Sequence, residues 1–212
     1  MLAGKRILLG VSGGIAAYKA VEVLRKLREQ GAEVRVVMTR NACRFVAPLT
    51  FSALSSAPVM TDEFDGSAWG SLGHIAVTDG LDLALVAPAT ANIIGKVAAG
   101  IADDALSTAL LAAECPLIMA PAMNDRMYRN AVLQRNINCL KSTGVRFVDP
   151  GTGALACGTA GTGRLADTDR ILQEAASVLS PKDLTGLSVL VTAGPTREQI
   201  DAARFISNPS TG

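Results

Sequence analysis

The stretch RILLGVSGGIAAYKAVEVLRKLREQGAEVRVVMT, residues 6–39, decides the fold. An apolar run at 6–11 is followed by a helical pattern over 15–31 and then by a second β-branched run at 33–39. A short apolar run bounded by glycine indicates a buried strand, and apolar residues recurring with the helical period indicate a helix, here ended by Gly31. The stretch therefore predicts a strand, a helix and a second strand.

The same alternation continues along the chain. Further strands are predicted at 81–87, 116–120 and 145–149, and helical segments near 91–113, 125–142 and 167–179. Strands that alternate with helices are joined by right-handed crossovers, which make the sheet mainly parallel and cover both of its faces. We expect an α/β fold over residues 1–180, with three layers and a Rossmann-like or flavodoxin-like sheet.

A second strand-then-glycine pattern begins after residue 180. The segment LSVLVTAG, 187–194, predicts a strand, but the 18 residues after it are too few for another strand–helix–strand unit. Residues 181–212 are then a linker and the opening of a second domain, or an edge strand followed by a disordered tail. We favour the opening of a second domain.

The composition excludes several classes of protein. The formal net charge of +1 gives no reason to expect nucleic acid or an anionic membrane as a partner. No apolar run approaches the roughly 18 residues of a membrane span, and the N-terminus lacks the features of a signal peptide. A single histidine argues against a zinc site. Four cysteines without CxxC spacing suggest reduced thiols in a cytoplasmic protein: Cys43, Cys115, Cys139 and Cys157.

The first two predicted strands end in loops that suit a mononucleotide. Ligands of open parallel sheets bind beyond the carboxyl ends of the strands. The loop GVSGGIAAYK, 10–19, lacks the P-loop lysine and the three glycines of a dinucleotide motif, but its turn and Ser12 suit a single phosphate at a helix N-terminus. After the second strand, Thr39, Arg40 and Asn41 include no acidic residue for the ribose of NAD. An ordinary strand-to-helix turn is the alternative.

Two later strands both end in Ala-Pro-Ala, which suggests two walls of one pocket. PATAN, 88–92, supplies Thr90 and Asn92, which either hydrogen-bond the edge of a flavin or pyrimidine or cap the next helix. PAMNDRMY, 121–128, supplies Asn124 directly after a buried strand.

Two further segments carry candidate proton-transfer groups. His74 is a structural histidine or, as the one imidazole of the sequence, the best candidate proton acceptor in the chain. The stretch GTGALACGTAGTGRLAD, 151–167, holds five glycines and suits a lid that closes over substrate. Cys157 lies within this stretch, where a thiol is either a reactive proton donor or inert.

With these motifs assembled, the sequence resembles the homo-oligomeric flavin-containing cysteine decarboxylases. The resemblance covers residues 4 to about 180 and includes SGGIAAYK, the His-Ile pair at His74, APATAN, PAMNDRM for PxMNxxM and ACGTAGTGR for ACGxxGxGR. Within the family, the chain looks like the phosphopantothenoylcysteine decarboxylases of bacterial coenzyme A synthesis. The tail LVTAGPTREQIDAARFISN is similar to the start of the ligase that joins phosphopantothenate to cysteine using CTP. Tyr128 and the segment TDGLD depart from the family pattern, which often has tryptophan at both places.

The resemblance implies a cofactor, a reaction and a set of residues. It implies FMN contacts at Ser12, Gly14, Ile15, Ala16, Thr39, Arg40, Asn41, Thr90, Ala91, Asn92, Ile93 and Ala122. It implies substrate contacts at Asn124, Ala156 and Leu165, with His74 as base, Asn124 holding the substrate carboxylate and Cys157 as acid. The implied reaction is FMN-dependent decarboxylation of 4′-phosphopantothenoylcysteine to 4′-phosphopantetheine. Relatives form trimers, often assembled into dodecamers, with FMN near subunit boundaries.

Three rival functions follow from other readings of the same residues. A decarboxylase of a peptide's C-terminal cysteine is disfavoured by the ligase-like tail. A non-catalytic regulatory flavoprotein is disfavoured by the presence of His74, Asn124 and Cys157. An NAD-dependent dehydrogenase is disfavoured by the missing acidic residue after the second strand.

Overall fold

A computed structural model describes residues 2–64, 69, 73–154, 160–181 and 183–210. The chain divides into two compact units, Met1–Ser180 and Pro181–Gly212, which are described separately. Each helix that the structure describes is too short or too polar to cross a membrane.

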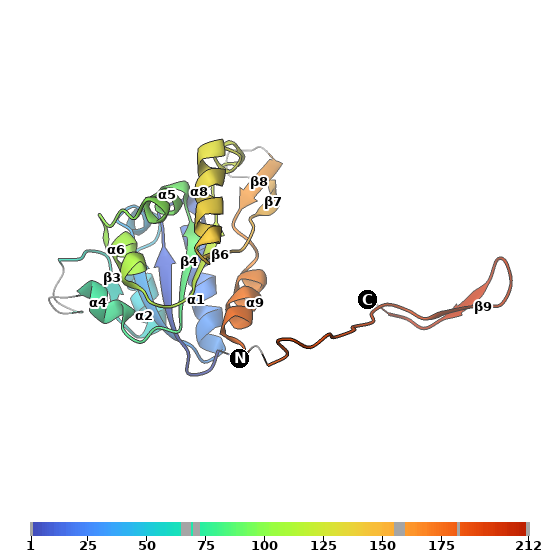
Figure 1. Ribbon diagram of the computed structural model, residues 1–212. Helices are drawn as coiled ribbons and strands as arrows, with labels where there is room; N and C mark the ends of the chain where they lie inside the picture. Colours follow the sequence, from blue (N-terminus) through green and yellow to red (C-terminus); the bar gives the residue numbers. More distant parts are fainter. Residues whose placement is uncertain (1, 65–68, 70–72, 155–159, 182, 211–212) are drawn as a thin grey trace. The chain divides into compact units, whose positions relative to one another are not determined.

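The first unit is built on a parallel sheet in the order β3-β2-β1-β4-β5-β6 (Figure 1). The strands are β1 (Arg6–Val11), β2 (Glu33–Met38), β3 (Val59–Met60), β4 (Leu83–Ala89), β5 (Leu117–Pro121) and β6 (Arg146–Phe147). All five strand pairs are parallel. The order reverses between β1 and β4, so the loops after these two strands leave the sheet in opposite directions and open a crevice between them. The predicted α/β class with a parallel sheet is confirmed.

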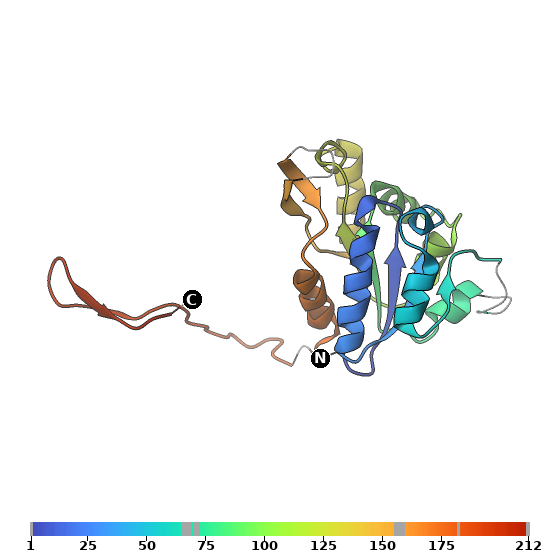
Figure 2. The ribbon, with the colours of Figure 1, turned by 180° about the vertical axis from the view of Figure 1, so that it is seen from behind.

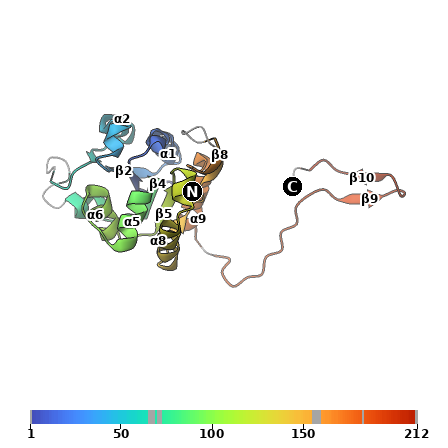
Figure 3. The same cartoon turned by 90° about the horizontal axis from the view of Figure 1, so that it is seen from above.

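Helices cover both faces of this sheet. In chain order they are η1 (Ile15–Lys19), α1 (Ala20–Glu29), η2 (Ala42–Arg44), α2 (Pro48–Ser55), α4 (Gly73–Thr78), α5 (Ala91–Ala99), α6 (Ala105–Ala112), α7 (Asp125–Tyr128), α8 (Ala131–Ser142) and α9 (Thr168–Leu179). Figure 2 shows α1, α2 and α9 over one face, and Figure 3 shows α5, α6 and α8 on the opposite side from α1 and α2. The predicted three layers are therefore present.

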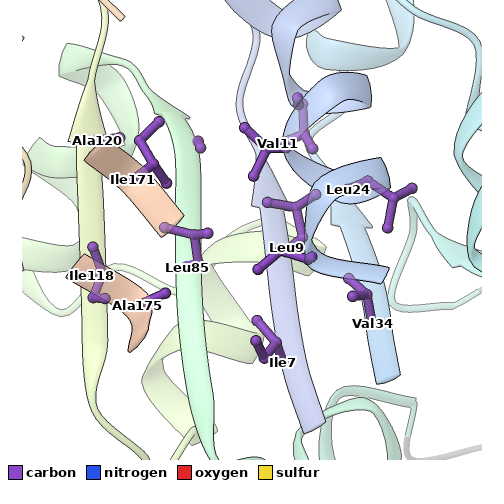
Figure 4. Close-up of a cluster of buried hydrophobic side chains, with 14 of the residues drawn as sticks. Ile7, Leu9, Val11, Leu24, Val34, Leu85, Ile118, Ala120, Ile171 and Ala175 are labelled. Carbon is purple, nitrogen blue, oxygen red and sulfur yellow. The ribbon is translucent and has the colours of Figure 1, made fainter. Parts of the chain in front are cut away.

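The four inner strands, β2, β1, β4 and β5, bury side chains on both faces. Leu9 of β1 belongs to the cluster under α1 and α9, which Figure 4 shows, whereas Leu8 belongs to the cluster under α5, α6 and α8. Every residue of β4 is buried. Burial on both faces explains why the strands read as continuous apolar runs, and each fully buried leucine contributes roughly 1.5–3 kcal/mol.

Several predicted elements differ in detail. The predicted helix over 91–113 is two helices, because Asp104 caps α6 by accepting a hydrogen bond from the Ser107 amide at 2.9 Å. The predicted helix over 125–142 is also two, because Asn130 caps α8 through a hydrogen bond from Val132 N. The short elements β3, α2 and α4 were not predicted.

The glycine-rich stretch, predicted as a loop, contains an antiparallel pair of strands. These strands, β7 (Gly151–Ala154) and β8 (Ala160–Arg164), form a hairpin, hereafter the glycine hairpin, at the end of the sheet to which the strand arrows point (Figure 1). Alternating glycines do not prevent strand pairing, since the ladder uses backbone groups. Ala156 and Cys157 lie outside the described residues.

In the second unit, the predicted strand at 187–194 is wrong. Those residues are exposed and have no strand assignment. The unit instead pairs β9 (Arg197–Gln199) with β10 (Phe205–Ser207). A strand requires a partner for its backbone groups, and the apolar pattern at 187–194 meets none among the described residues.

Candidate functional site

A cavity of about 750 Å³ lies beyond the carboxyl ends of β1, β4 and β5. It therefore occupies the crevice that the reversal of strand order creates. Its lining comes from the three strand-end loops and the glycine hairpin: Gly13, Gly14, Ile15, Ala16, Tyr18, Lys19, Thr90, Ala91, Asn92, Ala122, Met123, Asn124, Met127, Gly163, Arg164 and Leu165.

Ser12 ties the loop after β1 to the loop after β4. Its side chain is 1% exposed, and its Oγ lies 2.7 Å from the Pro88 carbonyl oxygen and 3.0 Å from Thr90 Oγ1. The same Oγ accepts a hydrogen bond from Thr90 N at 2.9 Å. Thr90 is the N-cap residue of α5 but makes no side-chain capping bond, so the alternative that its hydroxyl caps this helix is wrong. Its hydroxyl instead joins the buried network around Ser12.

The glycines of the first loop allow close approach of backbone. A Cβ atom at Gly13 would overlap the Asn41 side chain and would lie 2.8 Å from the Asn41 carbonyl carbon. A Cβ atom at Gly14 would lie 3.3 Å from Thr90 Cγ2. The helical segment η1 begins directly after Gly14 and continues into α1. The first amides of a helix lack intrahelical partners, and the helix dipole favours negative charge there. This end of the cavity suits a phosphate.

The loop after β5 carries Asn124 at the edge of the cavity. Its Oδ1 accepts a hydrogen bond from Arg126 N at 2.9 Å, so the side chain caps α7 and its orientation is fixed by the cap. The residues on either side of Asn124 hold the glycine hairpin. Met123 N donates to Gly163 O at 2.9 Å, and Asp125 Oδ1 accepts from Thr162 N at 3.3 Å.

The charges around the cavity favour an anionic ligand. Lys19, at the end of η1, and Arg164, at the end of β8, both line the cavity. The described lining residues include no aspartate or glutamate. Among all residues that the structure describes, no group of three or more histidine, cysteine, aspartate or glutamate side chains could hold a metal ion.

The cavity brings together most of the predicted site residues. Gly14, Ile15, Ala16, Thr90, Ala91, Asn92, Ala122, Asn124 and Leu165 all line it. Thr39 is buried behind the first loop, where its Oγ1 accepts a hydrogen bond from Ala42 N at 3.2 Å. Arg40 and Asn41 are exposed and do not line the cavity, and Ile93 is fully buried in the core beneath α5.

The structure does not bring His74 to this cavity. His74 lies on α4, at the β3 edge of the sheet, whereas the glycine hairpin lies towards the opposite edge (Figures 1 and 3). Arg35 holds α4 by donating to the carbonyl oxygens of Ala76, Val77 and Asp79. Within one chain, the predicted base and Asn124 are therefore separate.

Sequence reasoning missed several lining residues. These are Gly13, Tyr18, Lys19, Met123, Met127, Gly163 and Arg164. Each lies within or beside a quoted motif, so the motif boundaries were the available signal.

Two cysteines elsewhere are poor nucleophiles, because burial raises the pKa of the Cys43 and Cys115 thiols.

Comparisons with known proteins identify two families and several relatives that this chain matches. Residues 1–180 match the model of the Flavoprotein family, and residues 184–212 match the model of the DNA/pantothenate metabolism flavoprotein C-terminal domain. The coenzyme A biosynthesis bifunctional proteins CoaBC of Bacillus subtilis (strain 168) and Escherichia coli (strain K12) are 50% and 48% identical over 215 and 212 residues. These matches cover all of this chain, which spans only about half of each relative (53% and 52%).

Solved structures with the same fold include two relevant to the cavity. A PPC decarboxylase mutant complexed with pantothenoylaminoethenethiol is 32% identical, with a TM-score of 0.73, and the match covers 82% of this chain and 97% of that one. The FMN binding protein AtHal3 is 32% identical, with a TM-score of 0.71, and the match covers 82% and 95%.

Proposed function

The chain belongs to the Flavoprotein family, and we propose that it binds FMN and decarboxylates 4′-phosphopantothenoylcysteine to 4′-phosphopantetheine. The observation that carries this proposal is the convergence of a helix N-terminus, the Ser12–Thr90 network and Asn124 on one cavity. The two relatives named above match the whole of this chain and are coenzyme A biosynthesis proteins, which favours the pantothenate substrate. In the whole protein, residues 181–212 would open the ligase domain that joins phosphopantothenate to cysteine using CTP. The site of action would be the cytoplasm.

The residues around the first loop fit FMN. The overlap that a Cβ atom would cause at Gly13 shows how closely the loops after β1 and β2 approach, and the phosphate would take the amides at Gly14, Ile15 and Ala16. Thr39, Arg40 and Asn41 would lie along the cofactor edge, and the segment 90–93 with Ala122 would complete the seat. When bound, FMN supplies reversible two-electron oxidation of the substrate thiol, which creates an electron sink for decarboxylation.

On the substrate side, Asn124 orients the carboxylate that is lost. Capping of α7 by Oδ1 fixes the amide plane, so its NH2 group has a defined direction from which to donate to the carboxylate. Lys19 and Arg164 add positive charge suited to the substrate's phosphate and carboxylate. Leu165, which is 2% exposed, supplies an apolar wall that excludes water from the reacting carbon.

The proton-transfer groups require more than one copy of the chain. Because His74 stands away from the cavity of its own chain, we infer that a second copy brings its α4 to this cavity. Exposed apolar side chains at the cavity rim, Ile15, Tyr18 and Met127, suit such a contact. The assembly would be a trimer, grouped into a dodecamer. Cys157, on the segment between β7 and β8, would protonate the substrate carbon, with Ala156 beside the substrate.

The test compares two substrates on the purified, assembled protein. We expect a yellow protein that releases FMN on denaturation and releases CO2 from phosphopantothenoylcysteine, with 4′-phosphopantetheine identified by mass spectrometry. CO2 release only from a cysteine-ending peptide would identify a peptide decarboxylase instead. Yellow protein that releases no CO2 from either substrate would point to a regulatory flavoprotein, and protein without FMN would refute the proposal.

A further inference from the structure

We propose that Asp125 is a positioning residue that seats the glycine hairpin on the loop carrying Asn124. The inference rests on the proposed function for its effect on catalysis, but not for its structural part. Asp125 does not line the cavity itself, so it would act through its neighbours.

The two carboxylate oxygens of Asp125 join different parts of the chain. Oδ1 accepts the hydrogen bond from Thr162 N of β8, and Oδ2 pairs with the Arg129 guanidinium one helical turn further along. The Asp125 side chain is only 17% exposed, whereas that of Arg129 is 71% exposed. A hydrogen bond from an amide to a partly buried carboxylate is stronger than one to a neutral acceptor.

The glycines of β8 allow the two segments to touch. A Cβ atom at Gly161 would lie 2.8 Å from Asp125 Cβ, and one at Gly163 would overlap the Met123 carbonyl oxygen. The Met123 amide in turn donates to Gly163 O. Larger residues at 161 and 163 would hold the hairpin away from the loop. The glycines therefore serve the docking of the hairpin.

The arrangement couples the hairpin to the substrate site. Asn124 lies between Met123 and Asp125, the two residues that bind the hairpin, so docking of the hairpin fixes the loop on both sides of the substrate amide. Docking also brings Arg164 and Leu165 into the cavity wall. Loss of the Asp125 carboxylate should loosen both walls on the substrate side and leave the phosphate-binding loop unchanged.

The experiment compares Asp125→Ala and Asp125→Asn with a matched control in the FMN-loaded full protein. The control is Asp169→Ala, which removes the ion pair between Asp169 on α9 and Lys26 on α1; neither residue lines the cavity. Three quantities are measured: amide hydrogen exchange of peptides covering 150–165, FMN affinity, and kcat and KM for phosphopantothenoylcysteine. Asn keeps an oxygen acceptor of the same size, so this variant isolates the charge and remains informative if the alanine variant fails to fold.

We expect Asp125→Ala to increase the rate of amide hydrogen exchange in the hairpin by about 10-fold and to raise KM by about 10-fold, because the variant loses a hydrogen bond to a charged group. FMN affinity should stay within about twofold of wild type. Asp125→Asn should give a smaller change in the same direction, and Asp169→Ala none. Unchanged hairpin exchange in both Asp125 variants would overturn the proposal. Faster exchange with unchanged KM would refute the coupling to substrate. Wild-type protein without activity would refute the proposed function alone, because the exchange measurement does not depend on turnover.

Discussion

The loops that follow β4 and β5 both leave the sheet through Ala-Pro-Ala and both reach a polar N-cap residue, Thr90 or Asn124. The Thr90 hydroxyl joins the buried Ser12 network, and α5 behind it buries Ile93 and Ile94 completely. Asn124 instead caps α7, a four-residue helix without a buried residue. The loop after β4 is thus ordered by the core, whereas the loop after β5 is ordered by the glycine hairpin. The phosphate side of the cavity should therefore be the more rigid side, and the substrate side should depend on docking.

The largest effect is expected from Asn124→Asp. Aspartate caps a helix as well as asparagine does, so folding and FMN affinity should be kept. The loss of the amide donor and the added negative charge should lower kcat/KM for phosphopantothenoylcysteine by about 100-fold or more, the range for loss of one oriented donor. Steady-state CO2 release measures this. A variant with nearly full activity would mean that Asn124 only caps α7.

A smaller loss is expected from Gly163→Ala. Gly163 has φ +155°, and a Cβ atom there would overlap the Met123 carbonyl oxygen. Backbone strain of this kind costs roughly 1–3 kcal/mol, which should undock the hairpin in part of the molecules. KM should rise and limited proteolysis within 150–165 should accelerate, while FMN affinity stays constant. Gly151→Ala is the matched control, since its nearest contact would be 3.9 Å away. Equal behaviour of the two variants would contradict the docking role.

The third change, Ser12→Ala, tests the phosphate side of the cavity. It removes a buried hydroxyl and leaves the Thr90 amide without that acceptor, at a cost of about 1–3 kcal/mol. FMN affinity and thermal stability should fall together, because one network supports both, whereas KM at saturating FMN should change little. Flavin fluorescence titration and thermal unfolding measure the two effects. Ser52→Ala on α2 is the control, because the Ser52 hydroxyl donates to Leu49 O within its own helix.

The smallest effect is expected from Asp82→Asn, at the amino ends of the strands and away from the cavity. Asp82 accepts hydrogen bonds from Arg6 N at 2.8 Å and Lys5 Nζ at 2.9 Å, and these lower the pKa of its carboxyl from its ordinary value. A lowered folded-state pKa means that the carboxylate stabilises the fold above its unfolded pKa and loses this contribution as pH falls through the folded value. Asp82→Asn should therefore cost about 1 kcal/mol at neutral pH and less at about pH 2, because the stabilising contribution declines as pH falls towards the folded-state pKa. Denaturant unfolding at both pH values measures the difference, and FMN binding at neutral pH should not change.

Much of the fold and part of the site could be predicted from the sequence. The apolar runs placed β1, β2, β4 and β5 within about two residues, because burial on both faces leaves a continuous signal. Breaks within the helical segments were missed, since capping by Asp104 or Asn130 depends on a single side chain. The strand predicted at 187–194 failed because an apolar pattern alone does not supply a pairing partner.

By itself, the sequence determined a parallel α/β sheet, and with it the edge at which Ser12, Thr90 and Asn124 meet. Periodicity suffices for this, because it dictates which segments are strands and chirality dictates how they connect. Only the tertiary structure decided that the Thr90 hydroxyl hydrogen-bonds Ser12 and that β8 hydrogen-bonds the segment 123–125. It also decided that His74 lies outside the cavity of its own chain. The two hydrogen bonds join residues 78 and 37 positions apart in the sequence. At such separations the partner is determined by how the elements pack and not by a local sequence pattern.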